Sequence, residues 1–159
     1  MSMTATITPT RWDLDRHTVL DVRGADHTTR SAALDEIWQA MLDAGGTVRC
    51  IDPSGSRDAR PAGNVSSVVT LSGALSTVFD ALEIAAAEPA ARHLVLIDHA
   101  ELLLRGGGCS GNEFDAALAI LLAECDRSGV RVAIAHAGDL SRGAPMTAFA
   151  LREASKFDL

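Results

Sequence analysis

The strongest constraint on this chain is an alternation of short, β-branched apolar runs with longer stretches of helical periodicity. The apolar runs predict strands at residues 17–22, 47–52, 65–71, 93–98, 130–136 and 147–153. Apolar side chains at helical spacing predict helices at 28–44, 73–87 and 112–128. Several of the runs are apolar almost throughout, as in strands that helices cover on both faces. The pattern therefore predicts an α/β fold with a mainly parallel sheet.

The length of 159 residues suits one domain, and the chain has no internal repeat or low-complexity block. We expect residues 1–16 to form an N-terminal extension and residues 17–159 a single domain. No apolar run approaches the roughly 20 residues of a membrane span, and the first residues lack the apolar core of a signal peptide. We therefore expect a cytoplasmic protein, with its three dispersed cysteines reduced and serving as packing residues.

The formal net charge of −7 opposes general binding to nucleic-acid phosphates. Any DNA contact is expected to be local or made by a partner. A nucleic-acid-binding accessory protein remains an alternative, and it would need a positive patch built from Arg57, Arg60, Arg105, Arg142 and Arg152. Arginines in solvated loops are the simpler interpretation.

Residues 24–31, "GADHTTRS", have the length and end points of a phosphate-binding loop, G-x-x-x-x-G-K-[ST]. Gly24 and Ser31 match this pattern. Thr29 replaces a glycine that would let phosphate approach, and Arg30 replaces the lysine with a longer, planar cation. The alternative is an ordinary turn between strand and helix, with Thr28 or Thr29 as the helix cap.

Polar residues also follow two later strands. Asp98 ends the run "LVLID", where an aspartate can orient magnesium, and His99 stands where a catalytic glutamate is usual, with Glu101 two residues on. His136 ends the run "VRVAIAH", where many nucleotide-hydrolysing folds place a polar sensor. The alternatives are an aspartate that caps a strand end and a histidine of the core.

Taken in order, these segments resemble the motor core of the FtsK/SpoIIIE family of DNA-translocating ATPases, in the RecA-like P-loop class. The further segments that carry the resemblance are "TVRCIDPSG", "SSVVTLSGALSTVFDALE", "LVLIDHAELLL", "GVRVAIAHAGD" and "TAFALREASKFDL". The resemblance implies a three-layer fold. It also implies ATP with magnesium as the cofactor, if the site still binds it. Under it, the nucleotide contacts fall on Gly24, Thr28, Thr29, Arg30, Ser31 and His136, the magnesium ligands on Ser31 and Asp98, and the catalytic positions on His99 and Glu101.

The departures from the family pattern share one direction. The phosphate-loop Gly and Lys become Thr29 and Arg30, the catalytic Glu becomes His99, and a sensor Thr-Gln becomes His136-Ala137. The sequence ends at Leu159, where the family continues toward an arginine, and its length leaves no room for the family's further domains. We therefore expect a degenerate and truncated relative.

These departures favour a catalytically inactive pseudo-ATPase that acts by protein contact, as a regulator or accessory of a ring ATPase. Its expected partner is an FtsK-like ATPase or further copies of itself, and its composition suits a phage or mobile element. The alternative is an ATPase with a remodelled site, in which Arg30 contacts the phosphates, Ser31 and Asp98 hold magnesium, and His99 or Glu101 positions water.

Overall fold

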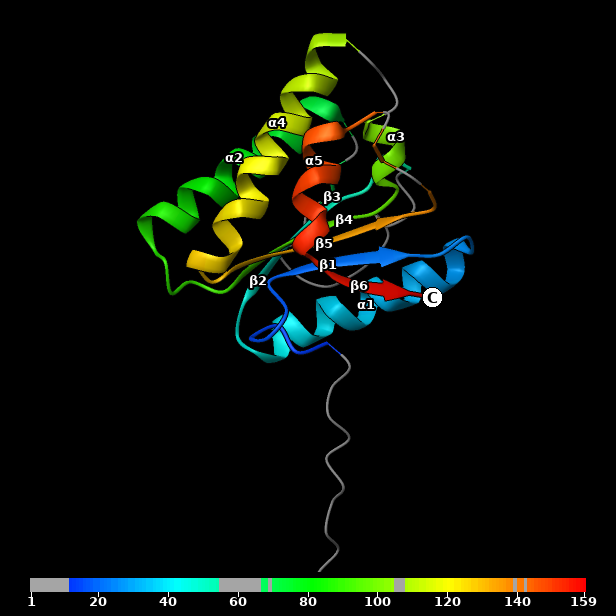
Figure 1. Ribbon diagram of the computed structural model, residues 1–159. Coiled ribbons are helices and arrows are strands. Elements are labelled where there is room, and N and C mark those ends of the chain that lie inside the picture. The colour runs from blue at the N-terminus through cyan, green and yellow to red at the C-terminus, as the bar shows by residue number, and fades with distance from the viewer. Residues whose placement is uncertain (1–11, 55–66, 69, 105–107, 139, 142) are drawn as a thin grey trace, which may run out of the picture.

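The computed structural model describes residues 12–54, 67–68, 70–104, 108–138, 140–141 and 143–159, and the predicted α/β fold is confirmed (Figure 1). Within these residues the strands form one sheet in the order β3-β2-β4-β5-β1-β6, and every neighbouring pair is parallel. The strands are β1 (Val19–Arg23), β2 (Thr47–Ile51), β3 (Ser67–Val68), β4 (His93–Ile97), β5 (Val130–His136) and β6 (Ser155–Asp158).

The helices cover both faces of the sheet and give the molecule three layers (Figure 1). They are α1 (His27–Asp43), α2 (Leu71–Ala87), α3 (Ala100–Leu104), α4 (Gly108–Glu124) and α5 (Pro145–Ala150), with 3₁₀ turns at Cys125–Arg127 and Leu151–Glu153. α1 packs on one face, against Leu20 and Val22 of β1. α2, α4 and α5 lie over the other face, toward which Val19 points. Both faces of β1 are buried, which explains its apolar run.

α1 has a sharp end at each terminus. Asp26 is its N-cap, so the interpretation that Thr28 or Thr29 caps this helix is wrong. At the other end Gly45 adopts φ 79°, and the N–H groups of Gly45 and Gly46 return to carbonyls of the last turn. This is a Schellman motif, which glycine favours because it has no Cβ to clash in the left-handed region.

The chain near the C-terminus differs from the sequence prediction. The strand expected at 147–153 is wrong: these residues form α5 and a 3₁₀ turn, and the strand follows as β6. Pro145 suits the first turn of a helix. The carboxylate of Asp115, buried in α4, accepts the backbone N–H groups of Thr147 (2.7 Å) and Met146 (3.1 Å). α5 thus receives its N-terminal cap from another helix.

Residues before the predicted domain start already pack on the core. Trp12 and Leu14 are buried on the α1 side, and the Trp12 ring lies 4.6 Å from that of Phe157. Cys50 and Cys125 are buried, and burial raises the pKa of Cys125 to about 12. None of the described helices is long and apolar enough to cross a membrane. Of the arginines proposed for a nucleic-acid patch, Arg57, Arg60, Arg105 and Arg142 lie outside the described residues.

Candidate functional site

The sheet order brings the ends of β1, β5 and β4 to one edge, with β5 in the middle. In parallel sheets this carboxyl edge is where ligands bind. The nucleotide-site residues that sequence analysis selected lie at the end of one of these strands or after it. They separate into three groups: the turn after β1, the end of β4, and the end of β5.

The turn after β1 is short and is closed by its own polar groups. Only Gly24, Ala25 and Asp26 separate β1 from α1. The carboxylate of Asp26 accepts hydrogen bonds from the Thr29 hydroxyl (2.7 Å) and the Thr28 N–H (3.1 Å). These two hydrogen bonds, that from Thr29 first, lower the pKa of Asp26. A carboxylate therefore sits at the helix N-terminus, where a bound anion would otherwise be favoured.

Arg30 closes the same turn from within the protein. Its side chain is buried, and Nη1 donates to the Gly24 carbonyl. On Gly24, an added Cβ would lie 3.2 Å from Cβ of Leu159, so the chain end packs tightly here too. Ser31 is half-buried in the second turn of α1.

A phosphate cradle needs backbone N–H groups and a cation that face the ligand. In this turn the Thr28 N–H and the Thr29 hydroxyl face Asp26, while the Arg30 guanidinium turns back to Gly24. The negative charge of Asp26 would also repel phosphate. These residues do not fit the phosphates of a nucleotide.

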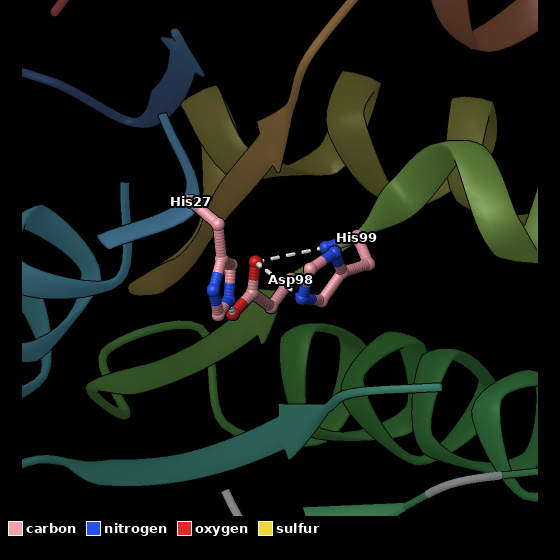
Figure 2. Close-up of side chains that lie close together, drawn as sticks. All are labelled: His27, Asp98 and His99. Atoms are coloured by element: carbon pink, nitrogen blue, oxygen red, sulfur yellow. Dashed lines mark hydrogen bonds and ion pairs between the residues drawn. The ribbon is translucent and has the colours of Figure 1, made fainter. Parts of the chain in front are cut away.

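At the end of β4, Asp98 lies fully buried beside two histidines, His27 and His99 (Figure 2). Nε2 of His27 is 3.8 Å from Oδ2 of Asp98, and Nε2 of His99 is 4.0 Å from Oδ1. The two imidazole rings stack, with centroids 4.4 Å apart and planes at 29°. Both distances are too long for hydrogen bonds. Within the described residues neither Nε2 atom has a hydrogen-bond partner, although both are buried.

The backbone at His99 is unusual, because its φ of 50° lies in the left-handed region. Histidine enters this region more often than most non-glycine residues, but the conformation is still uncommon and suggests a local constraint. The His99 N–H donates to Oδ1 of Asp98 at 2.9 Å. Glu101 lies in the first turn of α3, and its Oε2 is buried without a partner among the described residues. It is not part of the group formed by His27, Asp98 and His99.

Sequence analysis named Asp98 and His99 but missed His27. His27 begins α1, at the end of β1, and β5 separates β1 from β4 in the sheet. The signal that could have identified it is its position directly after a predicted strand, since such residues meet at the carboxyl edge.

At the end of β5, His136 is held in a buried ion pair with Asp21 of β1. Nε2 of His136 lies 2.6 Å from Oδ1 of Asp21, and Nδ1 bonds the Gly138 carbonyl. Both partner oxygens can accept a hydrogen bond from the imidazole ring. Arg23 adds hydrogen bonds of 2.7 and 2.9 Å to Oδ2 of Asp21. Burial alone would raise the pKa of Asp21, but the hydrogen bonds from His136 and Arg23 outweigh it, and this pKa is lowered.

The Asp21 and His136 pair lines a cavity of about 320 Å³ under α5, together with Arg23, Gly138 and Leu151. Sequence analysis missed Asp21 because it lies inside an apolar run. The ion pair explains how a carboxylate is tolerated on the core face of β1.

No family model and no curated protein matches this chain. The solved structures that resemble it include the following two. One is the cytoplasmic domain of the Thermomonospora curvata type VII secretion ATPase EccC, with a TM-score of 0.72 and 17% identity over 92% of this chain and 20% of that one. The other is the pCW3 conjugation coupling protein TcpA, in monomer form with ATPγS, with a TM-score of 0.63 and 14% identity over 84% of this chain and 48% of that one.

The chain thus spans about half the length of TcpA and a fifth of that of EccC. It has the fold of an FtsK-like motor domain, the fold of P-loop ATPases.

Proposed function

We propose that this chain is a non-hydrolysing protein with an FtsK-like fold that acts through protein contacts, as a regulator or accessory of an FtsK-like ring ATPase. The observation that carries the proposal is the closed turn after β1. The Thr28 N–H and the Thr29 hydroxyl donate hydrogen bonds to Asp26, and the Arg30 guanidinium donates to the Gly24 carbonyl. These are the groups that would have to bind phosphate.

The residue after Asp98 supports the same conclusion. ATP hydrolysis needs a base that polarises the attacking water, usually a glutamate at this position. His99 instead stacks on His27, and its backbone bonds to Asp98. Two separate requirements of hydrolysis, the phosphate cradle and the base, are thus altered together.

A groove between α4 and α5 is the proposed contact surface. It encloses about 690 Å³ and is lined mainly by apolar side chains, among them Leu122, Met146 and Phe149. Phe149 is 69% exposed. Asp126 and Glu153 also line the groove. Exposed apolar surface of this kind is typical of protein interfaces. The acidic residues and the net charge of −7 favour an apolar segment with basic flanks, and we assign it to the FtsK-like ATPase.

The experiment uses the purified protein with an FtsK-like ATPase from the same host. We expect a complex in analytical ultracentrifugation and a changed ATPase rate, and we expect Phe149→Asp to abolish both. Phe79→Asp is the matched control, because Phe79 is 50% exposed on α2, outside the groove. The proposal fails if no complex forms and the rate is unchanged, or if both variants act alike.

A second candidate is an ATP-binding protein with a remodelled site. It is favoured by the buried positive charge of Arg30 close to Gly24, and by the ATPγS in the TcpA structure. Thermal unfolding with millimolar magnesium and ATP separates the candidates. Stabilisation that Asp98→Asn removes would favour ATP binding, and no change in melting temperature would favour the non-hydrolysing protein.

A further inference from the structure

We propose that His27, Asp98 and His99 form a binding site for one first-row transition-metal ion, with Zn²⁺ the preferred ion. The ion would join the start of α1 to the end of β4. This site requires no nucleotide.

The first support is the convergence of the three side chains. One ligand atom from each lies within 4.8 Å of the other two. The separations of 3.8 and 4.0 Å between the histidine nitrogens and the Asp98 oxygens are longer than a hydrogen bond. They are closer to the spacing of two ligand atoms on one metal ion. Zinc bonds of about 2.0–2.1 Å place tetrahedral ligands roughly 3.3 Å apart. The two nitrogen–oxygen separations would therefore have to shorten by about 0.5 and 0.7 Å, and the two histidine nitrogens would have to approach each other as well.

The second support is the state of the ligand atoms. Both Nε2 atoms are buried and lack a hydrogen-bond partner among the described residues, which is costly for polar atoms. Asp98 is fully buried beside them, so a divalent cation would gain a desolvated negative charge. Figure 2 shows both imidazole rings close to this carboxylate.

The ligand types decide the class of metal. Two imidazoles with one carboxylate suit zinc and its neighbours, whereas magnesium prefers oxygen ligands. Three protein ligands also leave a coordination position for water or a partner's side chain.

The ligands combine firm anchors with one adjustable side chain. Asp98 is held by its backbone N–H, which donates to the Ile51 carbonyl at 2.9 Å, and by the His99 N–H on its carboxylate. Such outer hydrogen bonds orient metal ligands. The His27 side chain is 44% exposed at the first residue of α1, whereas that of His99 is 15% exposed. His27 can therefore turn out of the stack so that its lone pair meets the ion.

The test is calorimetric titration of the metal-free protein with Zn²⁺ alone. We expect one bound ion per chain, and at least a roughly tenfold weaker affinity in His27→Ala and in His99→Asn. Asparagine is chosen at position 99 because it tolerates the left-handed backbone. His17→Ala is the matched control, because His17 bonds Ser155 outside the cluster, and it should bind zinc as the wild type does.

A Co²⁺ spectrum supplies the second readout, because the bound ion should give tetrahedral d–d bands without a thiolate charge-transfer band. The proposal is overturned if the wild type binds no zinc, if His27→Ala and His99→Asn bind it unchanged, or if thiolate bands show that cysteine is the ligand. Equal affinity for Mg²⁺ would also overturn it. None of these outcomes depends on whether the chain contacts an ATPase.

Discussion

Two buried aspartates, Asp21 on β1 and Asp98 after β4, each lie close to histidine on strands that β5 separates, yet their surroundings differ. Asp21 on β1 contacts His136 at 2.6 Å and receives two further hydrogen bonds from Arg23. Asp98 after β4 has two histidine nitrogens near it, but at 3.8 and 4.0 Å. His136 has a hydrogen bond at each ring nitrogen, whereas Nε2 of His27 and of His99 has no hydrogen-bond partner in the part of the chain that the structure describes.

The difference indicates which of the two aspartates stabilises the fold and which could bind a ligand. A buried charge with complete hydrogen bonds gains little from a further ligand, and losing its partner is costly. A buried carboxylate beside unpaired imidazoles would gain from a cation. The Asp21 pair therefore serves the fold, and the Asp98 cluster is the better candidate for ligand binding.

The largest expected effect is on the Asp21 pair. His136→Ala should lower the free energy of unfolding by about 3–5 kcal/mol, because it leaves Asp21 buried without its main partner. His27→Ala should change it by less than about 0.5 kcal/mol in zinc-free buffer, because the His27 side chain is 44% exposed and its Nε2 has no hydrogen-bond partner among the described residues. Urea unfolding measures both. Similar losses in the two variants would remove the distinction between the clusters.

A medium effect is expected at Arg30. Arg30→Ala removes a charged donor from the Gly24 carbonyl and should cost about 1.5–3 kcal/mol. Arg127→Ala is the control, because Arg127 forms an exposed pair with Glu124, for which we expect less than about 1 kcal/mol. The same urea titration applies. If Arg30→Ala is as mild as the control, Arg30 does not hold the turn closed.

The smallest expected effect is a pH dependence at Asp21. Its pKa in the folded protein lies below the usual 3.8, so its ionised form stabilises the fold above that pH. This stabilisation is lost as the pH falls through the lower, native pKa. The difference in unfolding free energy between the wild type and Asp21→Asn should thus be constant near neutral pH and shrink below about pH 4. A difference that grows on acidification would contradict the lowered pKa.

The sequence predicted the parallel sheet and most helices because their signals are local. Apolar runs and helical periodicity are visible within each segment. The strand expected at 147–153 failed because the cap of α5 comes from Asp115, about thirty residues earlier. β6 was missed because three of the four residues in "SKFD" are polar and because, among the described strands, β6 pairs with β1 alone.

The site was predictable only in part. Asp98 and His99 were named because they directly follow a buried strand. The place of His27 in the site could be predicted only from the sheet order, in which β5 lies between β1 and β4. The contact made by Arg30 could be predicted only from the direction of its side chain. The position of Arg30 in the motif indicated a contact with phosphate, whereas its guanidinium donates a hydrogen bond to the Gly24 carbonyl of the same turn. Sequence spacing carries no information about that direction.

The most direct test is calorimetric titration of the wild-type protein with ATP in millimolar magnesium. The Thr28 N–H is hydrogen-bonded to Asp26, and the Arg30 guanidinium is hydrogen-bonded to the Gly24 carbonyl, so neither group faces a phosphate. We therefore predict no saturable heat up to millimolar ATP. Saturable binding of one ATP per chain would contradict the closed turn and, with it, the proposal that this fold no longer serves hydrolysis.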